Sequence, residues 1–172
     1  MRRTIGLVLA VVLTAGFAVT ARAGAAGKAS SDGGSNRRNV DVTFTKWVTS
    51  PPDDPSTLAG ISMAGVVGGD VGQGTYSGMV MSDDTTSRSG FWLAQALYGF
   101  RGSKHSFVAH NLITEDDTAT PITGTIRGYV VSGWMNGAIV TGEYTRLDPC
   151  PIPTPGNVLG AVCFQGTLHL RS

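Results

Sequence analysis

The stretch GTIRGYVVSGWMNGAIVTGEY, residues 124–144, alternates polar and apolar positions and is rich in Val, Ile, Thr and Tyr. A period of two with these residue types predicts paired β-strands. Glycine recurs inside the pattern, and glycine within a strand indicates tight coiling, a bulge or the close approach of another backbone. The stretch therefore predicts a hairpin in a small, strongly coiled sheet.

Two registers are possible for this hairpin. A turn at residues 134–136 sets Arg127 opposite Glu143, whereas a two-residue turn at 136–137 sets Arg127 opposite Arg146. Like charges directly opposite each other destabilise a sheet, so we expect the first register, with Arg127 and Glu143 paired on the surface. The inward face of this hairpin then consists of Gly124, Ile126, Gly128, Val130, Ala138, Val140, Gly142 and Tyr144.

Glycine marks the inward face of this hairpin, and the same rule assigns faces elsewhere. It predicts inward positions at Tyr76, Gly78 and Val80, at Phe91, Leu93, Gln95, Leu97 and Gly99, and at Val162, Phe164, Gly166, Leu168 and Leu170. Alternate residues of each strand then meet solvent.

Eight stretches carry strand signals separated by turn residues. They are 40–49, 57–67, 73–82, 89–101, 104–114, 121–133, 137–147 and 161–171. Apolar residues rarely recur at helical spacing, so an all-β domain is predicted. Eight sequential strands can close an antiparallel up-and-down β-barrel, which we expect, or form a β-sandwich, which is the alternative.

The N-terminus has the features of a bacterial secretory signal peptide. Basic residues precede an apolar run at 5–19, and Ala21 and Ala23 supply the small residues that a signal peptidase requires. We expect cleavage after Ala23 and an extracellular protein. An uncleaved anchor is the alternative, but the run is short for a membrane span and no basic stop-transfer flank follows it.

The remaining chain has the size and composition of one domain. Residues 24–39 are rich in glycine and serine and predict a flexible linker, and residues 40–172 then form a single barrel domain. Removal of Arg2, Arg3 and Arg22 leaves ten basic and twelve acidic residues, a formal charge of −2. No basic stripe is visible, so a nucleic-acid partner is not expected.

Both cysteines lie in the secreted part. Cys150 and Cys163 flank a turn-rich segment with three prolines and two glycines, so in an oxidising compartment we expect a disulfide. Two thiols without nearby histidines do not supply the four ligands of a tetrahedral zinc site. His105 and His110 are an odd number of residues apart and face opposite sides of a strand, and His169 faces outward. No metal or other cofactor is predicted.

A candidate ligand site remains inside the barrel. A two-residue turn at 102–103 pairs Gln95 with His110, and Tyr76 and Tyr144 share their predicted face. An apolar cavity with a few convergent polar groups is typical of a small-molecule site. His110 and Tyr144 are the candidate catalytic residues, because either side chain can move a proton. The alternative is a filled core in which Gln95 and His110 bond each other.

Acidic residues and aromatics complete the predictions. The runs Asp83-Asp84 and 115–117 are expected in solvated hairpin loops. The predicted outer face between residues 91 and 107 carries an apolar patch, which indicates an interface and hence a homo-oligomer or a partner that covers the patch. The aromatic residues of this predicted interface are Trp92, Tyr98, Phe100 and Phe107.

Three segments together resemble the bacterial proteins grouped with the allene oxide cyclase and dirigent barrels. They are GSKHSF at 102–107, the stretch 122–144, and CFQGTL at 163–168. The resemblance implies an eight-stranded antiparallel barrel, often trimeric, with an apolar cavity. Plant members cyclise or steer reactive hydrophobic intermediates, and some bacterial relatives cyclise polyketide-like substrates.

Two kinds of function follow from these observations. The first is a non-catalytic secreted barrel that binds a small apolar molecule or acts as an interaction module. The second is a cyclase or isomerase that shapes a hydrophobic substrate by confinement. No catalytic constellation is evident in the sequence, which favours the first.

Overall fold

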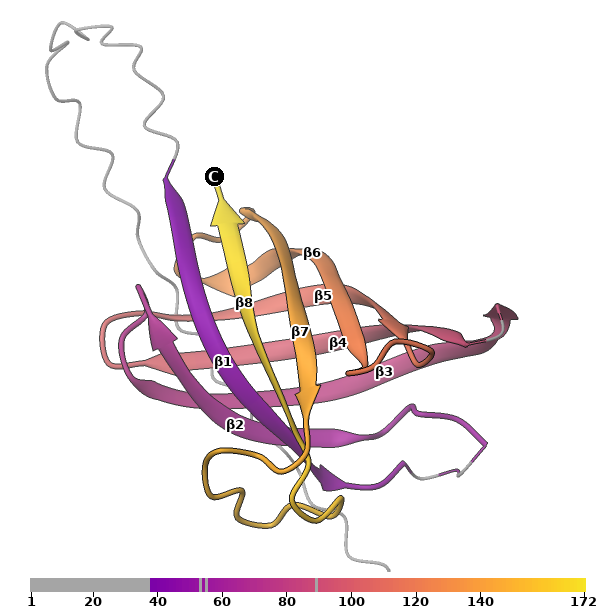
Figure 1. Ribbon diagram of the computed structural model, residues 1–172. Helices are drawn as coiled ribbons and strands as arrows, with labels where there is room; N and C mark the ends of the chain where they lie inside the picture. Colours follow the sequence, from indigo (N-terminus) through magenta and orange to yellow (C-terminus); the bar gives the residue numbers. More distant parts are fainter. Residues whose placement is uncertain (1–37, 53, 55, 89) are drawn as a thin grey trace, which may run out of the picture. The chain divides into compact units, whose positions relative to one another are not determined.

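A computed structural model describes residues 38–52, 54, 56–88 and 90–172, and within them every regular element is a β-strand (Figure 1). The strands are β1 (Asn39–Ser50), β2 (Ser62–Gly69), β3 (Gly74–Arg88), β4 (Phe91–Gly102), β5 (Ser106–Asp116), β6 (Thr123–Gly133), β7 (Ile139–Leu147) and β8 (Cys163–Arg171). Each pairs antiparallel with the next, and β8 pairs with β1. The predicted closed, eight-stranded up-and-down barrel is therefore confirmed, and the sandwich is excluded.

The predicted signal peptide at 1–23 and most of the predicted linker at 24–39 lie outside the described residues. The described part of the chain contains no helix long and apolar enough to cross a membrane.

All eight predicted strands are present. The bounds of six agree with the prediction to within two residues, and those of β2 and β3 differ more. Residues 57–61, predicted as strand, form turns in which Gly60 has a φ of 87° and the Ile61 amide bonds the Leu58 carbonyl. Strand β3 continues to Arg88 beyond a bulge near residue 81 and pairs there with the start of β4. The acidic pair Asp83-Asp84, predicted in a loop, therefore lies in a strand.

The predicted registers of both hairpins are wrong by two residues. Arg127 lies opposite Thr141, because the hairpin closes at Val130, which donates a backbone hydrogen bond to the Ala138 carbonyl, while residues 132 and 133 continue to pair with β5. No ion pair joins Arg127 to Glu143 among the described residues. Leu97 lies opposite His110, because the turn is formed by Ser103 and Lys104, one residue later than predicted, with the Gly102 amide bonded to the His105 carbonyl at 3.0 Å.

A shift of two residues preserves the faces of a strand, so the inward face of the β6–β7 hairpin is confirmed. Ile126, Val130, Val140 and Tyr144 are buried, whereas Arg127 is exposed. The predicted inward positions of β3 and β8 are also confirmed. Tyr76, Val80, Leu168 and Leu170 are buried there, and Val162, directly before β8, is buried as well.

The faces of β4, in contrast, are inverted relative to the prediction. Tyr98 and Phe100 are buried inside the barrel, while Gln95 is exposed on the outer wall. Gly99 points outward, toward the Ser77 hydroxyl, so the glycine rule fails here. The physical reason is size, because the two large rings bury more apolar surface inside the barrel. Both faces of this strand are apolar, so alternation in the sequence does not show which face points inward.

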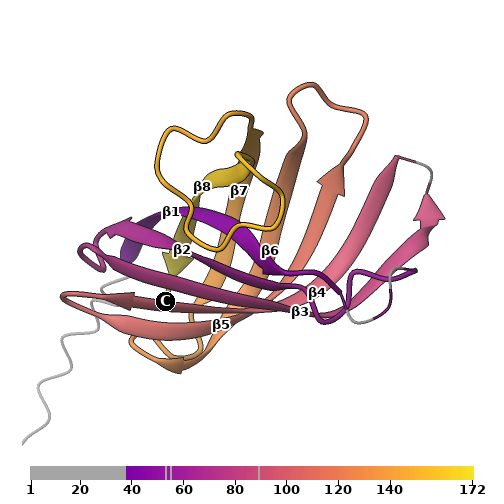
Figure 2. The same ribbon diagram turned by 90° about the horizontal axis from the view of Figure 1, so that it is seen from below.

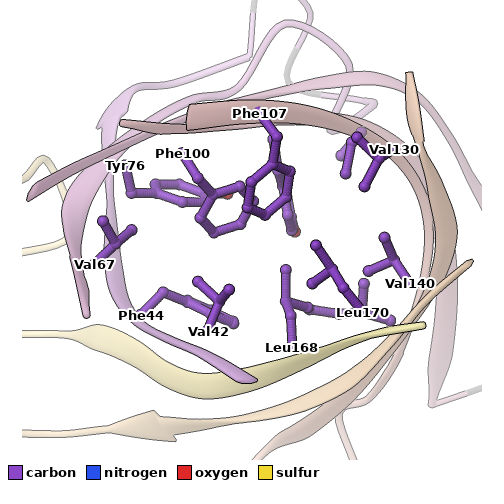
Figure 3. Close-up of a cluster of buried hydrophobic side chains, with 14 of the residues drawn as sticks. Val42, Phe44, Val67, Tyr76, Phe100, Phe107, Val130, Val140, Leu168 and Leu170 are labelled. Carbon is purple, nitrogen blue, oxygen red and sulfur yellow. The ribbon is translucent and has the colours of Figure 1, made fainter. Parts of the chain in front are cut away.

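One half of the barrel, the half next to the β2–β3, β4–β5 and β6–β7 turns, is filled by aromatic and aliphatic side chains (Figure 3). Phe100 and Phe107 stack with centroids 4.6 Å apart, and Tyr76 meets Phe100 edge-on at 5.4 Å. Figure 3 shows these rings facing Val42, Phe44, Leu168 and Leu170 across the barrel axis. We call this the packed half.

Glycines leave room for rings in the interior. A Cβ on Gly124 would overlap the ring of Tyr144, which lies directly opposite on β7. A Cβ on Gly166 would meet Phe44 and the Tyr144 Cβ at 2.8 Å. These inward glycines therefore allow large side chains of neighbouring strands to lie close to their backbone. Small and large inward residues alternate in this way in a small barrel.

The predicted Cys150–Cys163 disulfide is confirmed, with the two Cα atoms 5.3 Å apart. It closes the β7–β8 loop, which folds against the end of β1 (Figure 2). Trp47 donates a hydrogen bond from Nε1 to the Pro155 carbonyl at 3.0 Å, and the Val158 amide bonds the Val48 carbonyl at 2.9 Å. The loop thus covers Trp47, which is buried although it faces outward.

We predict that Gly124→Ala lowers the free energy of unfolding by about 1–3 kcal/mol, because the added methyl group overpacks the Tyr144 ring. Urea denaturation measures the change. The matched control is Thr125→Ala on the exposed outer face of the same strand, which should change stability by less than about 1 kcal/mol. Equal losses in a Tyr144→Val background and in the natural sequence would contradict the proposed clash.

Candidate functional site

The other half of the barrel is hollow. The β1–β2, β3–β4, β5–β6 and β7–β8 loops lie at one end of the barrel (Figures 1 and 2). A cavity of about 680 Å³ opens at this end, lined in part by Leu58, Asp117 and Leu159 of these loops. We call it the end cavity. Its apolar wall is formed by Val48, Leu58, Ile61, Met63, Val80, Phe91, Ala94, Ile113, Ile122, Leu159 and Phe164. The volume falls in the range of about 300–1,000 Å³ that is usual for small-molecule sites.

Polar side chains from four strands line the inner part of the end cavity. Lys46 on β1 points inward because it has the same parity as Phe44 and Val48, and only 4% of it is exposed. Its Nζ donates a hydrogen bond to the Tyr98 hydroxyl oxygen at 2.6 Å. The same atom lies 4.3 Å from the centroid of the Tyr144 ring and 4.6 Å from that of Tyr98. Among the described residues Lys46 forms no ion pair.

A buried carboxyl group lies across the end cavity. Glu115 near the end of β5 accepts a hydrogen bond from the Tyr144 hydroxyl at 2.5 Å and another from Trp92 Nε1 at 3.0 Å. Both donors hold the carboxyl group inside the barrel, where 7% of the residue is exposed. The run 115–117 was predicted as a solvated loop, which is wrong for Glu115, because β5 continues through Asp116 and its alternation turns Glu115 inward.

Burial controls the protonation of this site. It lowers the pKa of Lys46 to about 7, against the opposing influence of the Glu115 charge. Burial raises the pKa of Glu115, while the hydrogen bond from Tyr144 and the charge of Lys46 act in the other direction. The hydroxyl pKa values of Tyr98 and Tyr144 are raised by burial as well. The end cavity thus holds an amine and a carboxyl group that both tend toward their neutral forms.

Of the four residues predicted to bind a ligand, Tyr144 lines the end cavity. Tyr76 lies inside the barrel in the packed half, with its ring edge-on to Tyr98 at 5.2 Å. Gln95 and His110 are on the outer wall, opposite Leu112 and Leu97 respectively, so they neither meet nor reach the cavity. His110 therefore lies outside the barrel, and Tyr144 is the predicted catalytic candidate that remains in the site.

The four residues predicted to form an interface point into the barrel instead of outward. Tyr98, Phe100 and Phe107 are at most 3% exposed, and Trp92 lines the end cavity. Because β4 turns its other face outward, the outer wall carries a different set of apolar side chains. Met79, Leu97, Tyr129 and Ile139 belong to one cross-strand row over β3 to β7, in which His110 lies between Leu97 and Tyr129.

The sequence contained signals for the two residues that were missed. Lys46 interrupts an apolar alternation of Val40, Val42, Phe44 and Val48, and this parity places its side chain inside. Glu115 has the parity of Phe107 and Ile113 in the same way. A charged residue at an inward position is the pattern that identifies the site.

No three His, Cys, Asp or Glu side chains gather in a way that could hold a metal ion within the described residues. Comparison of the chain with protein-family models, curated proteins and solved structures finds no match. The resemblance to the allene oxide cyclase and dirigent barrels therefore stays a prediction from the sequence segments.

We predict that the stability of Lys46→Met relative to that of the natural protein falls as the pH rises from about 7 to 9. The folded-state pKa of Lys46, about 7, lies below the unfolded value of 10.5, so the unfolded state binds more protons in this window. The natural protein therefore gains stability with rising pH, and the methionine variant lacks this gain. Urea denaturation at several pH values measures the difference. Lys104→Met, at an exposed loop position, is the control, and parallel profiles for Lys46→Met and the natural protein would contradict the assignment.

Proposed function

We propose that this protein is a secreted β-barrel that binds a small apolar molecule in the end cavity. The observation that carries the proposal is the cavity itself, with an apolar wall around a few inward polar groups. The packed half closes the other end, so a ligand enters through the loop-bearing end. The disulfide and the signal features of the N-terminus support an extracellular location.

Ile61→Trp should weaken binding of the neutral fluorophore N-phenyl-1-naphthylamine by about tenfold or more, which corresponds to about 1.4 kcal/mol. Ile61 lines the mouth of the cavity and is only partly buried, so a larger ring occupies ligand space without disturbing the packed half. Fluorescence titration with the purified protein measures the dissociation constant.

Val66→Trp on the outer wall of β2, the strand that follows Ile61, is the control and should leave the dissociation constant within about twofold. An unchanged affinity in Ile61→Trp, or no binding by the natural protein, would refute the proposed site. Native mass spectrometry of the purified protein would identify a molecule that it retains.

A cyclase or isomerase is the second candidate function. The observation that favours it is the buried hydrogen bond between Tyr144 and Glu115, which lines the same cavity and can relay a proton. Tyr144→Phe separates the two functions, because it removes the hydroxyl and keeps the ring. A binding protein keeps its affinity in this variant, whereas an enzyme of this kind loses turnover while still binding.

We also propose that copies of this chain associate, as the sequence predicted, but through the outer row that includes Met79, Tyr129 and Ile139. These three side chains are 42%, 52% and 59% exposed, and residues of five neighbouring strands make the row continuous. Contiguous apolar surface of this kind marks interaction sites. Ile139→Asp should shift the mass measured by light scattering toward the monomer, whereas Thr141→Asp on the same face should not. A natural protein that is already monomeric would refute association.

A further inference from the structure

We propose that Lys46 is a reactive amine that holds an apolar aldehyde or ketone in the end cavity as a reversible imine. This inference rests on the proposed binding function and names the chemical class of its ligand. It is carried by the position of Nζ, which belongs to the one buried lysine of the described residues and borders the cavity.

The surroundings of Lys46 suit a neutral amine better than an ammonium ion. An ammonium group has three N–H donors, and Nζ makes one hydrogen bond within the described part of the protein, to Tyr98. A buried charge is costly unless it is paired and hydrogen-bonded, and no carboxylate of the described residues forms an ion pair with Nζ. The tyrosine rings stabilise a cation in part, but they accept no conventional hydrogen bond. A free amine leaves its lone pair available for chemistry.

Protonation agrees with this geometry. The groups that face Lys46 are Tyr98 on β4, Glu115 on β5 and Tyr144 on β7, with Phe44 and Phe164 completing the ring of neighbours. Because burial outweighs the attraction of Glu115, the pKa of Lys46 falls to about 7. About half of the Lys46 side chains are then uncharged at neutral pH, as nucleophilic catalysis by lysine requires.

The reaction balances without an oxidant or a reductant. The Nζ lone pair attacks the carbonyl carbon, a C–N bond forms, and the π electrons of the carbonyl group move to its oxygen. The nitrogen gives up one proton and the oxygen takes one up, which gives a neutral carbinolamine. Protonation of that hydroxyl group lets it leave as water while the nitrogen loses a proton, and a C=N bond results. Amine and carbonyl compound thus give imine and water, and hydrolysis reverses the step.

The residues of the cavity can supply the proton transfers. The Tyr98 hydroxyl contacts Nζ directly. Glu115, whose pKa is raised by burial, is the acid that can protonate the departing hydroxyl group, with Tyr144 between it and the amine. The apolar wall takes the hydrocarbon part of the ligand, and water leaves through the mouth.

Reductive trapping tests the proposal. The purified protein is incubated with decanal and sodium cyanoborohydride, which reduces an imine to a stable secondary amine, and peptide mass spectrometry locates the product. The sequence has three lysines, Lys28, Lys46 and Lys104. We expect alkylation of Lys46 to exceed that of Lys104 by about tenfold or more at pH 7, because an ordinary lysine with a pKa near 10.5 is almost fully protonated there.

Variants and pH give independent controls. Lys104→Arg should keep the adduct and Lys46→Arg should lose it, with circular dichroism to verify folding. In the natural protein the trapping rate should rise with a midpoint near pH 7 instead of near pH 10. Equal labelling of Lys46 and Lys104, or a midpoint near 10, would overturn the proposal even if a variant failed to fold.

Decanol distinguishes this proposal from the binding function on which it rests. The alcohol has the same chain but cannot form an imine. If decanol displaces N-phenyl-1-naphthylamine while decanal gives no adduct at Lys46, the binding function stands and the imine is refuted. If neither compound binds, both proposals fail.

Discussion

Pairing of β8 with β1 is the constraint on which the rest of the structure depends. Eight residues of β1 pair with β8, from Asn39 opposite Arg171 to Lys46 opposite Phe164, and this ladder closes the sheet. Closure removes both free edges and divides every strand into an inner and an outer face. Lys46 is the last residue of the ladder, so the pairing that closes the barrel also fixes the reactive side chain inside it.

Closure creates an interior that the side chains fill unequally. Rings and branched aliphatic side chains occupy the half that contains Phe100 and Phe107, and glycines such as Gly124 make room for Tyr144 near the middle. Toward the other end the connections 51–61, 117–122 and 148–162 are longer than those at the packed end, and the inward positions of β4 include a small residue, Ala94. The interior therefore combines both predicted alternatives: it is a packed core in one half and a ligand-sized cavity in the other.

Local patterns predicted the fold well, because strand alternation and turn residues act over a few neighbours. The strand count, the inward face of β6 and β7 and the disulfide all follow from such patterns. The faces of β4 do not, since Trp92 and Leu93, like Tyr98 and Leu97, make both faces apolar, and only the whole barrel decides which rings fit inside. The presence of Lys46 and Glu115 in one site was not predicted for a related reason: the two residues come from strands far apart in the sequence, so no local pattern connects them. Histidine is a common catalytic residue, but the inward positions of Lys46 and Glu115 in their strands identify the site.

The energetics of the end cavity argue that it serves more than folding. A buried lysine with one hydrogen bond is less favourable than an apolar side chain of similar size, and so is a carboxyl group held away from solvent. An unfilled cavity likewise forgoes the packing that the other half of this barrel achieves. These three costs occur together around one cavity. Elsewhere inside the barrel, the Tyr76 hydroxyl and Asn111 Oδ1 are also buried without a hydrogen-bond partner among the described residues. Destabilising residues that lie together, as they do around this cavity, are typical of functional sites, where a protein is less stable because a polar group is positioned to bind a ligand.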